Sequence, residues 1–164
     1  MTHREAIKEW LSKIHLKDEE VIDWGSGSKP AFRYIQQENC QFTTADNAPG
    51  IPQDRKGYRH LDADISKPIE IDLGDRKQFD TAFCLEVLEH VENPEQLLRN
   101  IFDNLKDGGM LYLSAPFKYE IHADADYWRY TANGLRLLLE RVGFQIISIN
   151  ETVEELGYIV EARR

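Results

Sequence analysis

Residues 21–30, VIDWGSGSKP, join a short apolar run to two closely spaced glycines and then to a proline. The apolar start predicts a buried strand, and Gly25 and Gly27 would let the backbone that follows approach a ligand closely. Pro30 suits the first turn of a helix, where a backbone N–H would have no partner in any case. A glycine loop that leads into a helix favours negative charge, although Gly-x-Gly alone also fits an ordinary strand-to-helix turn.

Predicted strands and helices alternate on both sides of this loop. Thr2 and Glu5 have the spacing of a capping box, which predicts a helix near the N-terminus. Ala31, Phe32 and Ile35 would form the buried face of the helix that follows the glycine loop. Strands are also predicted at residues 40–46, 58–65, 79–87 and 110–116, and helices at residues 93–108 and 131–143.

This alternation predicts an α/β fold with a doubly wound, mostly parallel sheet and helices on both faces. Residues 144–149 and 157–162 would add a C-terminal antiparallel hairpin. We expect a single domain over residues 1–164, with 1–19 as an N-terminal helix and lead-in and 20–164 as the core. Residues 47–57, NAPGIPQDRKG, are rich in proline and glycine, so we expect an extended loop there rather than a helix.

Composition bounds the partners and the compartment. The 164 residues carry 20 Lys and Arg against 29 Asp and Glu, a formal net charge of −9. This charge repels a phosphate backbone, so we expect no nucleic-acid partner. No apolar run approaches the roughly 18 residues of a membrane span, and the N-terminus lacks the apolar centre of a signal peptide. Cys40 and Cys84 fall in predicted strands, which suits a reduced, cytoplasmic protein.

Two aspartates stand close to the glycine loop or at a matching distance from it. Asp46 ends the second predicted strand 19 residues after Gly27, where an acid takes the ribose hydroxyls in dinucleotide folds. The third glycine of the dinucleotide fingerprint would stand at Pro30, so that fingerprint is incomplete. Asp23, just before the loop, could accept a hydrogen bond from a loop N–H or lie near a cationic ligand.

Asp-x-Gly-x-Gly at residues 23–27 resembles the signature loop of class I S-adenosylmethionine-dependent methyltransferases. Two later segments, FDTAFCLEVLEHVENPEQLLRNIFDNLKDGGMLYLSAPF and HADADYWRYTANGLRLLLERVGF, resemble the small-molecule branch of that family in the same order. The resemblance covers about residue 20 to the C-terminus. It implies a Rossmann-like fold, S-adenosyl-L-methionine as the cofactor and a small-molecule acceptor. Lys29 replaces the usual third small residue of the loop, and we expect it to point away from the ligand.

The resemblance also implies roles for residues that match the family's positions. The loop residues Asp23, Gly25, Ser26 and Gly27 would hold the methionine part of the cofactor, and Asp46 would bind the ribose. Asp64 is the first choice for the acid that meets the adenine, with Ile65 beside it and Asp62 as the second choice. The backbone of Cys84 and Leu85 would hold the methionine amino group.

Two histidines are candidates for a general base, should the acceptor need one. His90 stands in the turn Leu88-Glu89-His90, where a structural role is the alternative. His122 lies in residues 116–130, the loop predicted to build the acceptor site. A metal site of His122, Asp124 and Asp126 is the alternative to a solvated acidic loop, and we expect no metal.

The sequence leaves the roles of other side chains near the predicted site open. Tyr127, Trp128 and Tyr130 would wall a pocket or pack the last helix, and Glu86 would meet a substrate or solvent. The predicted function is methyl transfer to a small molecule or a glycan precursor. The alternatives are a cofactor-binding protein that has lost catalysis and a nicotinamide-dependent oxidoreductase. The sequence leaves the acceptor atom and the oligomeric state open.

Overall fold

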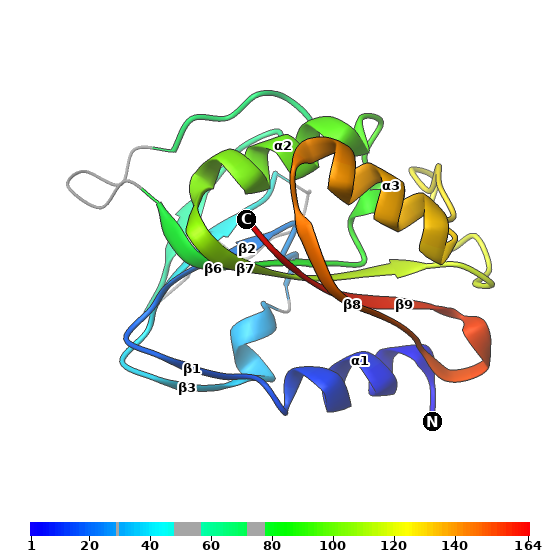
Figure 1. Ribbon diagram of the computed structural model, residues 1–164, viewed down its shortest axis with the longest axis horizontal. Coiled ribbons are helices and arrows are strands. Elements are labelled where there is room, and N and C mark those ends of the chain that lie inside the picture. The colour runs from blue at the N-terminus through cyan, green and yellow to red at the C-terminus, as the bar shows by residue number, and fades with distance from the viewer. Residues whose placement is uncertain (29, 48–56, 72–77) are drawn as a thin grey trace.

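The computed structural model describes residues 1–28, 30–47, 57–71 and 78–164. Its main element is a seven-stranded sheet in the order β5-β4-β2-β6-β7-β9-β8 (Figure 1). In that order, the strands are Arg59–Leu61, Gln41–Ala45, Glu20–Trp24, Phe79–Leu85, Leu105–Pro116, Gly157–Arg163 and Gln145–Glu151. The first five strands are parallel, and β9 pairs antiparallel with both β7 and β8. The predicted mostly parallel sheet with a C-terminal antiparallel hairpin is confirmed.

The strand order reverses at β2. The chain leaves β2 toward β4 and β5 on one side, and returns to β6 and β7 on the other. Loops after β2 and β6 therefore diverge at the same edge of the sheet, which is where open α/β sheets bind their ligands.

Helices cover both faces of the sheet, as predicted (Figure 1). α1 (His3–Leu11) lies on one face, and α2 (Pro94–Asn104) and α3 (Ala132–Val142) lie on the other. Successive side chains of β2 point to opposite faces, as the strand period of two requires. Val21 accordingly packs in the core beneath α1, whereas Ile22 packs in the larger core beneath α2 and α3.

Each helix begins at a side-chain cap. Thr2 and Glu5 form the predicted capping box, in which each side chain accepts a hydrogen bond from the other's backbone N–H. Asn93 and Thr131 each accept a hydrogen bond from the backbone N–H three residues later. Such caps stabilise a helix by about 1 kcal/mol each, and they fix the starts that the sequence predicted.

The helix predicted after the glycine loop is wrong. Only a single 3-10 turn, Ala31–Arg33, follows Pro30, and the chain then runs into the short strand β3 (Gln36–Glu38). β3 pairs in parallel with β1 (His15–Lys17), a strand inside the predicted lead-in that the sequence analysis missed. The physical reason is length: the few residues before β4 begins cannot form several helical turns and also return along the sheet.

The consequences of this correction reach the predicted buried face. Ala31 is buried, but Phe32 and Ile35 are only partly so. Phe32 instead packs against the rings of Phe42 and Tyr58, at centroid distances of 4.9 and 5.0 Å. Where a helix was expected, the chain thus forms these aromatic contacts and the two-stranded sheet of β1 and β3.

Boundaries differ in smaller ways elsewhere. α2 ends at Asn104 rather than at the glycine pair 108–109, because Leu105 already pairs with Phe79 in the sheet. The glycines form an irregularity inside β7, where the register shifts and Gly108 has a φ of +80°. β5 is shorter than the predicted strand at residues 58–65.

Two predictions fall outside the described residues. Lys29 is one, and most of the connection predicted to lack a helix at 47–57 is the other. Within the described parts of the chain, the structure has no helix that is both long and apolar enough to span a membrane.

Candidate functional site

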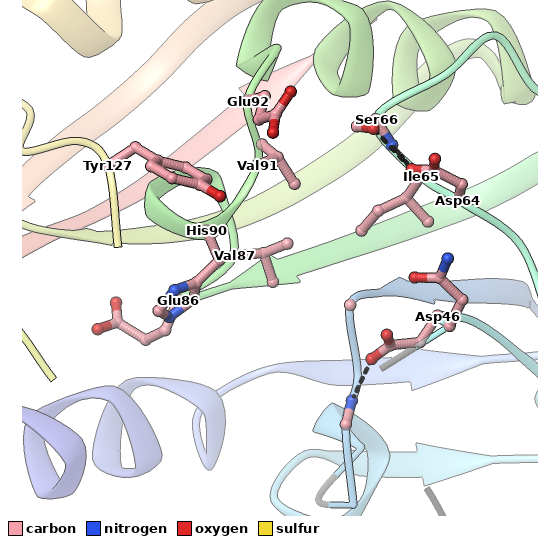
Figure 2. Close-up of a pocket in the computed structure, with 13 residues that line it drawn as sticks. Asp46, Asp64, Ile65, Ser66, Glu86, Val87, His90, Val91, Glu92 and Tyr127 are labelled. Atoms are coloured by element: carbon pink, nitrogen blue, oxygen red, sulfur yellow. Dashed lines mark hydrogen bonds between the residues drawn. The ribbon is translucent and has the colours of Figure 1, made fainter. Parts of the chain in front are cut away.

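A cavity of about 440 Å³ opens at the carboxyl ends of β2, β4 and β6, where the strand order reverses. Figure 2 shows its lining, which comes from the glycine loop, the end of β4, the segment after β5, the turn after β6, and Tyr127. Residues that are far apart in sequence thus meet around one space. Of the residues predicted to bind the cofactor, Gly25, Gly27, Asp46, Asp64 and Ile65 line this cavity.

The two glycines of the loop are needed for different reasons. Both have left-handed backbone angles, with φ of +70° at Gly25 and +52° at Gly27. A Cβ at Gly25 would lie 2.6 Å from the side-chain methyls of Val87, in the turn after β6. A Cβ at Gly27 would meet no described atom within 4 Å. Gly25 therefore lets two segments close on each other, whereas Gly27 borders open space in the cavity lining.

Asp46 joins the end of β4 to the glycine loop. Its Oδ2 accepts a hydrogen bond of 2.8 Å from the backbone N–H of Gly27, drawn as a dashed line in Figure 2. The side chain is mostly buried yet lines the cavity. The spacing noticed in the sequence therefore corresponds to a direct contact between the loop and the acid.

Asp23 lies beneath the loop rather than in the cavity lining. Its Oδ2 accepts a hydrogen bond of 2.6 Å from the backbone N–H of Ala31, which is one of the two roles considered for it. Burial raises the pKa of Asp23 to about 7; the Ala31 N–H opposes this shift, and the charge of Asp46 adds to it. Ser26 is partly buried in the loop and is not part of the lining.

The segment after β5 brings Asp64 and Ile65 to the cavity, but not Asp62, which is exposed. The carboxylate of Asp64 accepts hydrogen bonds from the hydroxyl and backbone N–H of Ser66 and pairs with Lys67 Nζ at 2.9 Å. Hydrogen bonds from Ser66 and Lys67 lower the pKa of Asp64 to about 2. Asp64 is therefore a carboxylate held in a fixed direction.

At the end of β6, the cavity is lined by Glu86 and Val87 rather than by Cys84 and Leu85. Cys84 is fully buried, and burial raises the pKa of its thiol well above the ordinary value. Glu86 has a left-handed φ of +55°, and its N–H donates to the backbone oxygen and the hydroxyl of Ser114. This turn places Glu86 and Val87 in the cavity lining.

Glu86 takes part in a network that sequence reasoning missed. His3, in the first turn of α1 and 2% exposed, has its Nε2 3.0 Å from Glu86 Oε2 and its Nδ1 2.8 Å from Thr152 Oγ1. The hydroxyl of Thr152 donates to the backbone oxygen of Gly157, and that of Ser114 donates to Glu86 Oε1. No local pattern could have revealed this network, because its members lie 83 and 149 residues from His3.

The far wall of the cavity is His90, at the end of the 3-10 turn Leu88–His90, together with Tyr127. His122 is not part of the lining but lies directly behind His90, with the two Nε2 atoms 3.2 Å apart. Both predicted bases therefore meet, and His90 is the one that borders the cavity.

The loop that carries His122 is fixed onto the turn after β6 by hydrogen bonds. The N–H of Tyr127 donates to Glu89 O, the indole N–H of Trp128 to Val91 O, and the hydroxyl of Tyr130 to Leu88 O. Tyr127 thus walls the cavity, whereas Trp128 and Tyr130 hold the loop in place. Anchoring the loop on the turn after β6 is a role that the sequence did not suggest for Trp128 and Tyr130.

The alternative metal site of His122, Asp124 and Asp126 does not form among the described residues. Asp124 is exposed, and Asp126 pairs with Arg129 and with His122 Nδ1. The hydrogen bond from Arg129 holds the pKa of Asp126 well below its usual range. Asp126 is therefore a fixed charge behind His122.

Comparison with known proteins adds family information. A family described as a methyltransferase domain matches residues 2–149. A ubiquinone biosynthesis O-methyltransferase of Coxiella burnetii is 28% identical over 106 residues, which are 62% of this chain and 45% of that protein. The chain thus spans less than half the length of this relative.

Solved structures share the fold. A Haloferax volcanii methyltransferase, in complex with the Trm112 methyltransferase activator, superimposes with a TM-score of 0.78 at 17% identity, covering 98% of this chain and 89% of that one. The 1,6-didemethyltoxoflavin-N1-methyltransferase of Burkholderia thailandensis, with its acceptor and S-adenosylhomocysteine bound, gives 0.71 at 20% identity over 99% and 77%.

Proposed function

The chain belongs to the methyltransferase-domain family, and from that premise we propose that it transfers a methyl group from S-adenosylmethionine to a small-molecule acceptor. The observation that carries the proposal is the continuous cavity that runs from the glycine loop and Asp46 to His90 and Tyr127. Such a cavity can hold a cofactor at one end and an acceptor at the other.

The cofactor would lie along the loop side. The backbone at Gly25 and Gly27 would border its methionine part, with Asp23 and Ser26 supporting the loop from below. Asp46 would accept hydrogen bonds from the ribose hydroxyls, and Asp64 with Ile65 would meet the adenine. The strand exit, from Cys84 and Leu85 to Glu86, would receive the amino group. The geometry supports this arrangement because Asp46 and Asp64 both lie in the lining.

The acceptor would enter beside His90 and Tyr127. When bound, S-adenosylmethionine would supply an activated methyl group for transfer to the acceptor. The protein's task is then to align the acceptor, and orientation alone can contribute roughly 7–11 kcal/mol. An oxygen acceptor is the first to test, because the Coxiella burnetii relative is by name an O-methyltransferase.

Titration calorimetry with S-adenosylmethionine, S-adenosylhomocysteine and NAD tests the proposal. We expect heat of binding for the first two ligands and none for NAD. Tight NAD binding with no heat for either of the others would favour the oxidoreductase. A screen of small hydroxylated acceptors, read out as S-adenosylhomocysteine formed, then separates an active enzyme from a cofactor-binding protein without turnover.

A further inference from the structure

Three side chains able to bind a metal meet behind the histidine end of the cavity. They are Glu89, His90 and His122, and one ligand atom from each lies within 4.8 Å of the others. The Nε2 of His90 lies 3.2 Å from the Nε2 of His122 and 3.5 Å from Glu89 Oε1. His122 and His90 come from different loops, so their approach is a product of the tertiary fold.

The outer nitrogens of both histidines face only acceptors. His90 Nδ1 contacts the backbone oxygen of Ala125. His122 Nδ1 contacts the carboxylate of Asp126 at 3.1 Å and the backbone oxygen of Glu120 at 3.3 Å. Each Nδ1 therefore faces an acceptor, which leaves the two Nε2 atoms, 3.2 Å apart, as the ring nitrogens able to bind a ligand. At 3.2 Å the two Nε2 atoms need a cation between them, either a proton shared in an N–H···N hydrogen bond or a metal ion.

Metal-binding histidines have this same arrangement. Their second ring nitrogen almost always donates to a carboxylate or a backbone oxygen, which fixes the tautomer and the ring direction. Asp126 plays that part for His122, and Ala125 plays it for His90. Asp126 is itself held by Arg129, so the direction of the His122 ring is fixed from behind.

Glu89 is the independent observation that points to a ligand. Its side chain is 0% exposed, and neither carboxylate oxygen has a hydrogen-bond partner of normal geometry among the described residues. Burying a carboxylate in this way is costly unless it is paired or binds a metal.

We propose that Glu89, His90 and His122 bind a divalent transition-metal ion, with Zn²⁺ as the best match. Ligand atoms 2.0–2.1 Å from a tetrahedral Zn²⁺ lie about 3.3 Å apart, and the two measured separations that involve His90 Nε2 are 3.2 and 3.5 Å. Two imidazoles and one carboxylate are a known Zn²⁺ set that leaves the fourth position open. This set differs from the one weighed from sequence, with which it shares only His122.

The ion would lie at the wall that His90 forms. If the proposed function holds, the open position could take the acceptor's hydroxyl oxygen and favour loss of its proton. The two histidines would then act as ligands, and neither would serve as the base.

Zn²⁺ titrated into metal-free, full-length protein without S-adenosylmethionine tests the site by calorimetry. We expect one ion per chain. Glu89→Gln and His122→Ala should each weaken binding by more than about 100-fold, since loss of a partner behind a ligand already costs about 10- to 100-fold. Co²⁺ in place of Zn²⁺ should give the visible absorption of a tetrahedral site, and this absorption should disappear in both variants.

His15→Ala is the matched control, because His15 is exposed on β1 and bonds only its own neighbourhood, at Lys13 O. It should leave Zn²⁺ affinity unchanged, and circular dichroism should show all three variants folded. Absence of Zn²⁺ binding, or equal affinity in wild type, Glu89→Gln and His122→Ala, overturns the metal site. Methyl transfer that persists without Zn²⁺ binding would remove the metal and leave the proposed function standing. Zn²⁺ binding without S-adenosylmethionine binding would support the metal site and contradict the proposed function.

Discussion

The cavity has two walls that differ in how their polar groups are satisfied. The glycine wall consists of Gly25, Gly27 and Asp46, and its carboxylate already accepts a backbone N–H. The histidine wall consists of His90 and Tyr127, with Glu89 and His122 behind it, and the buried carboxylate of Glu89 has no hydrogen-bond partner among the described residues. The carboxylate of the glycine wall is thus satisfied within the protein, whereas the buried carboxylate behind the histidine wall is not satisfied by the described residues.

Gly25→Val should have the largest effect, because it breaks the glycine wall in both structure and binding. The new side chain would collide with Val87 and would hold a left-handed φ of +70°. Overpacking costs about 1–3 kcal/mol, and backbone strain of this kind adds about 1–3 kcal/mol. Denaturant unfolding should show a loss of several kcal/mol, and calorimetry should show no binding of S-adenosylmethionine.

Gly27→Ala is the matched control for that variant. Its Cβ meets no described atom, so only the left-handed backbone remains costly, at about 1–2 kcal/mol. Equal stability losses in the two variants would show that the contact between the loop and Val87 is not what Gly25 protects.

Asp23→Asn sharpens the comparison by testing the support beneath the glycine wall. The folded pKa of about 7 lies above the ordinary value of 3.8, so between these values the native state holds a proton that the unfolded state has lost. Stability should therefore fall as pH rises through that window, at most by roughly 1.4 kcal/mol per pH unit. Asn keeps an oxygen for the Ala31 N–H but has no charge.

The difference in unfolding free energy between the wild type and Asp23→Asn, measured from pH 4 to 8, isolates this group. The difference should shift in favour of Asn up to about pH 7 and then stay constant. A difference that does not change with pH would mean that Asp23 has an ordinary pKa in the folded protein.

Asp46→Ala should affect binding more than folding. A carboxylate that holds ribose hydroxyls makes charge-assisted hydrogen bonds worth about 1.5–3 kcal/mol. S-adenosylmethionine should bind about 10- to 100-fold more weakly in calorimetry. Asp62→Ala is the control, because Asp62 is exposed and lies outside the lining. If Asp46→Ala leaves the Kd unchanged, another group binds the ribose.

Tyr130→Phe should have the smallest effect and should touch the histidine wall alone. It removes the hydroxyl that donates to Leu88 O at 3.1 Å, which is worth about 1 kcal/mol. We expect that loss in denaturant unfolding, with S-adenosylmethionine affinity unchanged. A weaker cofactor affinity would mean that the two walls are coupled.

The glycine wall could be predicted from the sequence because its members follow the ends of two predicted strands. Gly25 and Gly27 come after β2, and Asp46 comes after β4. Since β2 and β4 are parallel neighbours, their ends meet at one edge, and a count of residues along the chain is enough to bring the groups together. The sheet and its order of elements were predictable on the same basis.

Only part of the histidine wall and of the cluster behind it could be predicted from the sequence. His90 and His122 were picked out singly, but their contact depends on where the loop from residue 117 to 131 folds back on the turn after β6. Glu89 was not predicted as a site residue, because a glutamate beside a histidine in a turn does not indicate burial. The missing helix after Pro30 was a failure of local pattern, because proline and apolar spacing predicted a helix that the chain length did not allow.

The contact between His3 and Glu86 connects the first turn of α1 to a residue that lines the cavity. Arg4 is exposed next to His3, so a trypsin cut there would release the imidazole that faces Glu86 and leave most of α1 in place. Limited digestion at Arg4 would therefore affect Glu86, although the two residues are far apart in the sequence. A bound ligand that holds Glu86 in position should slow that cut, which makes the rate of loss of a few N-terminal residues a simple reporter of occupancy in the cavity.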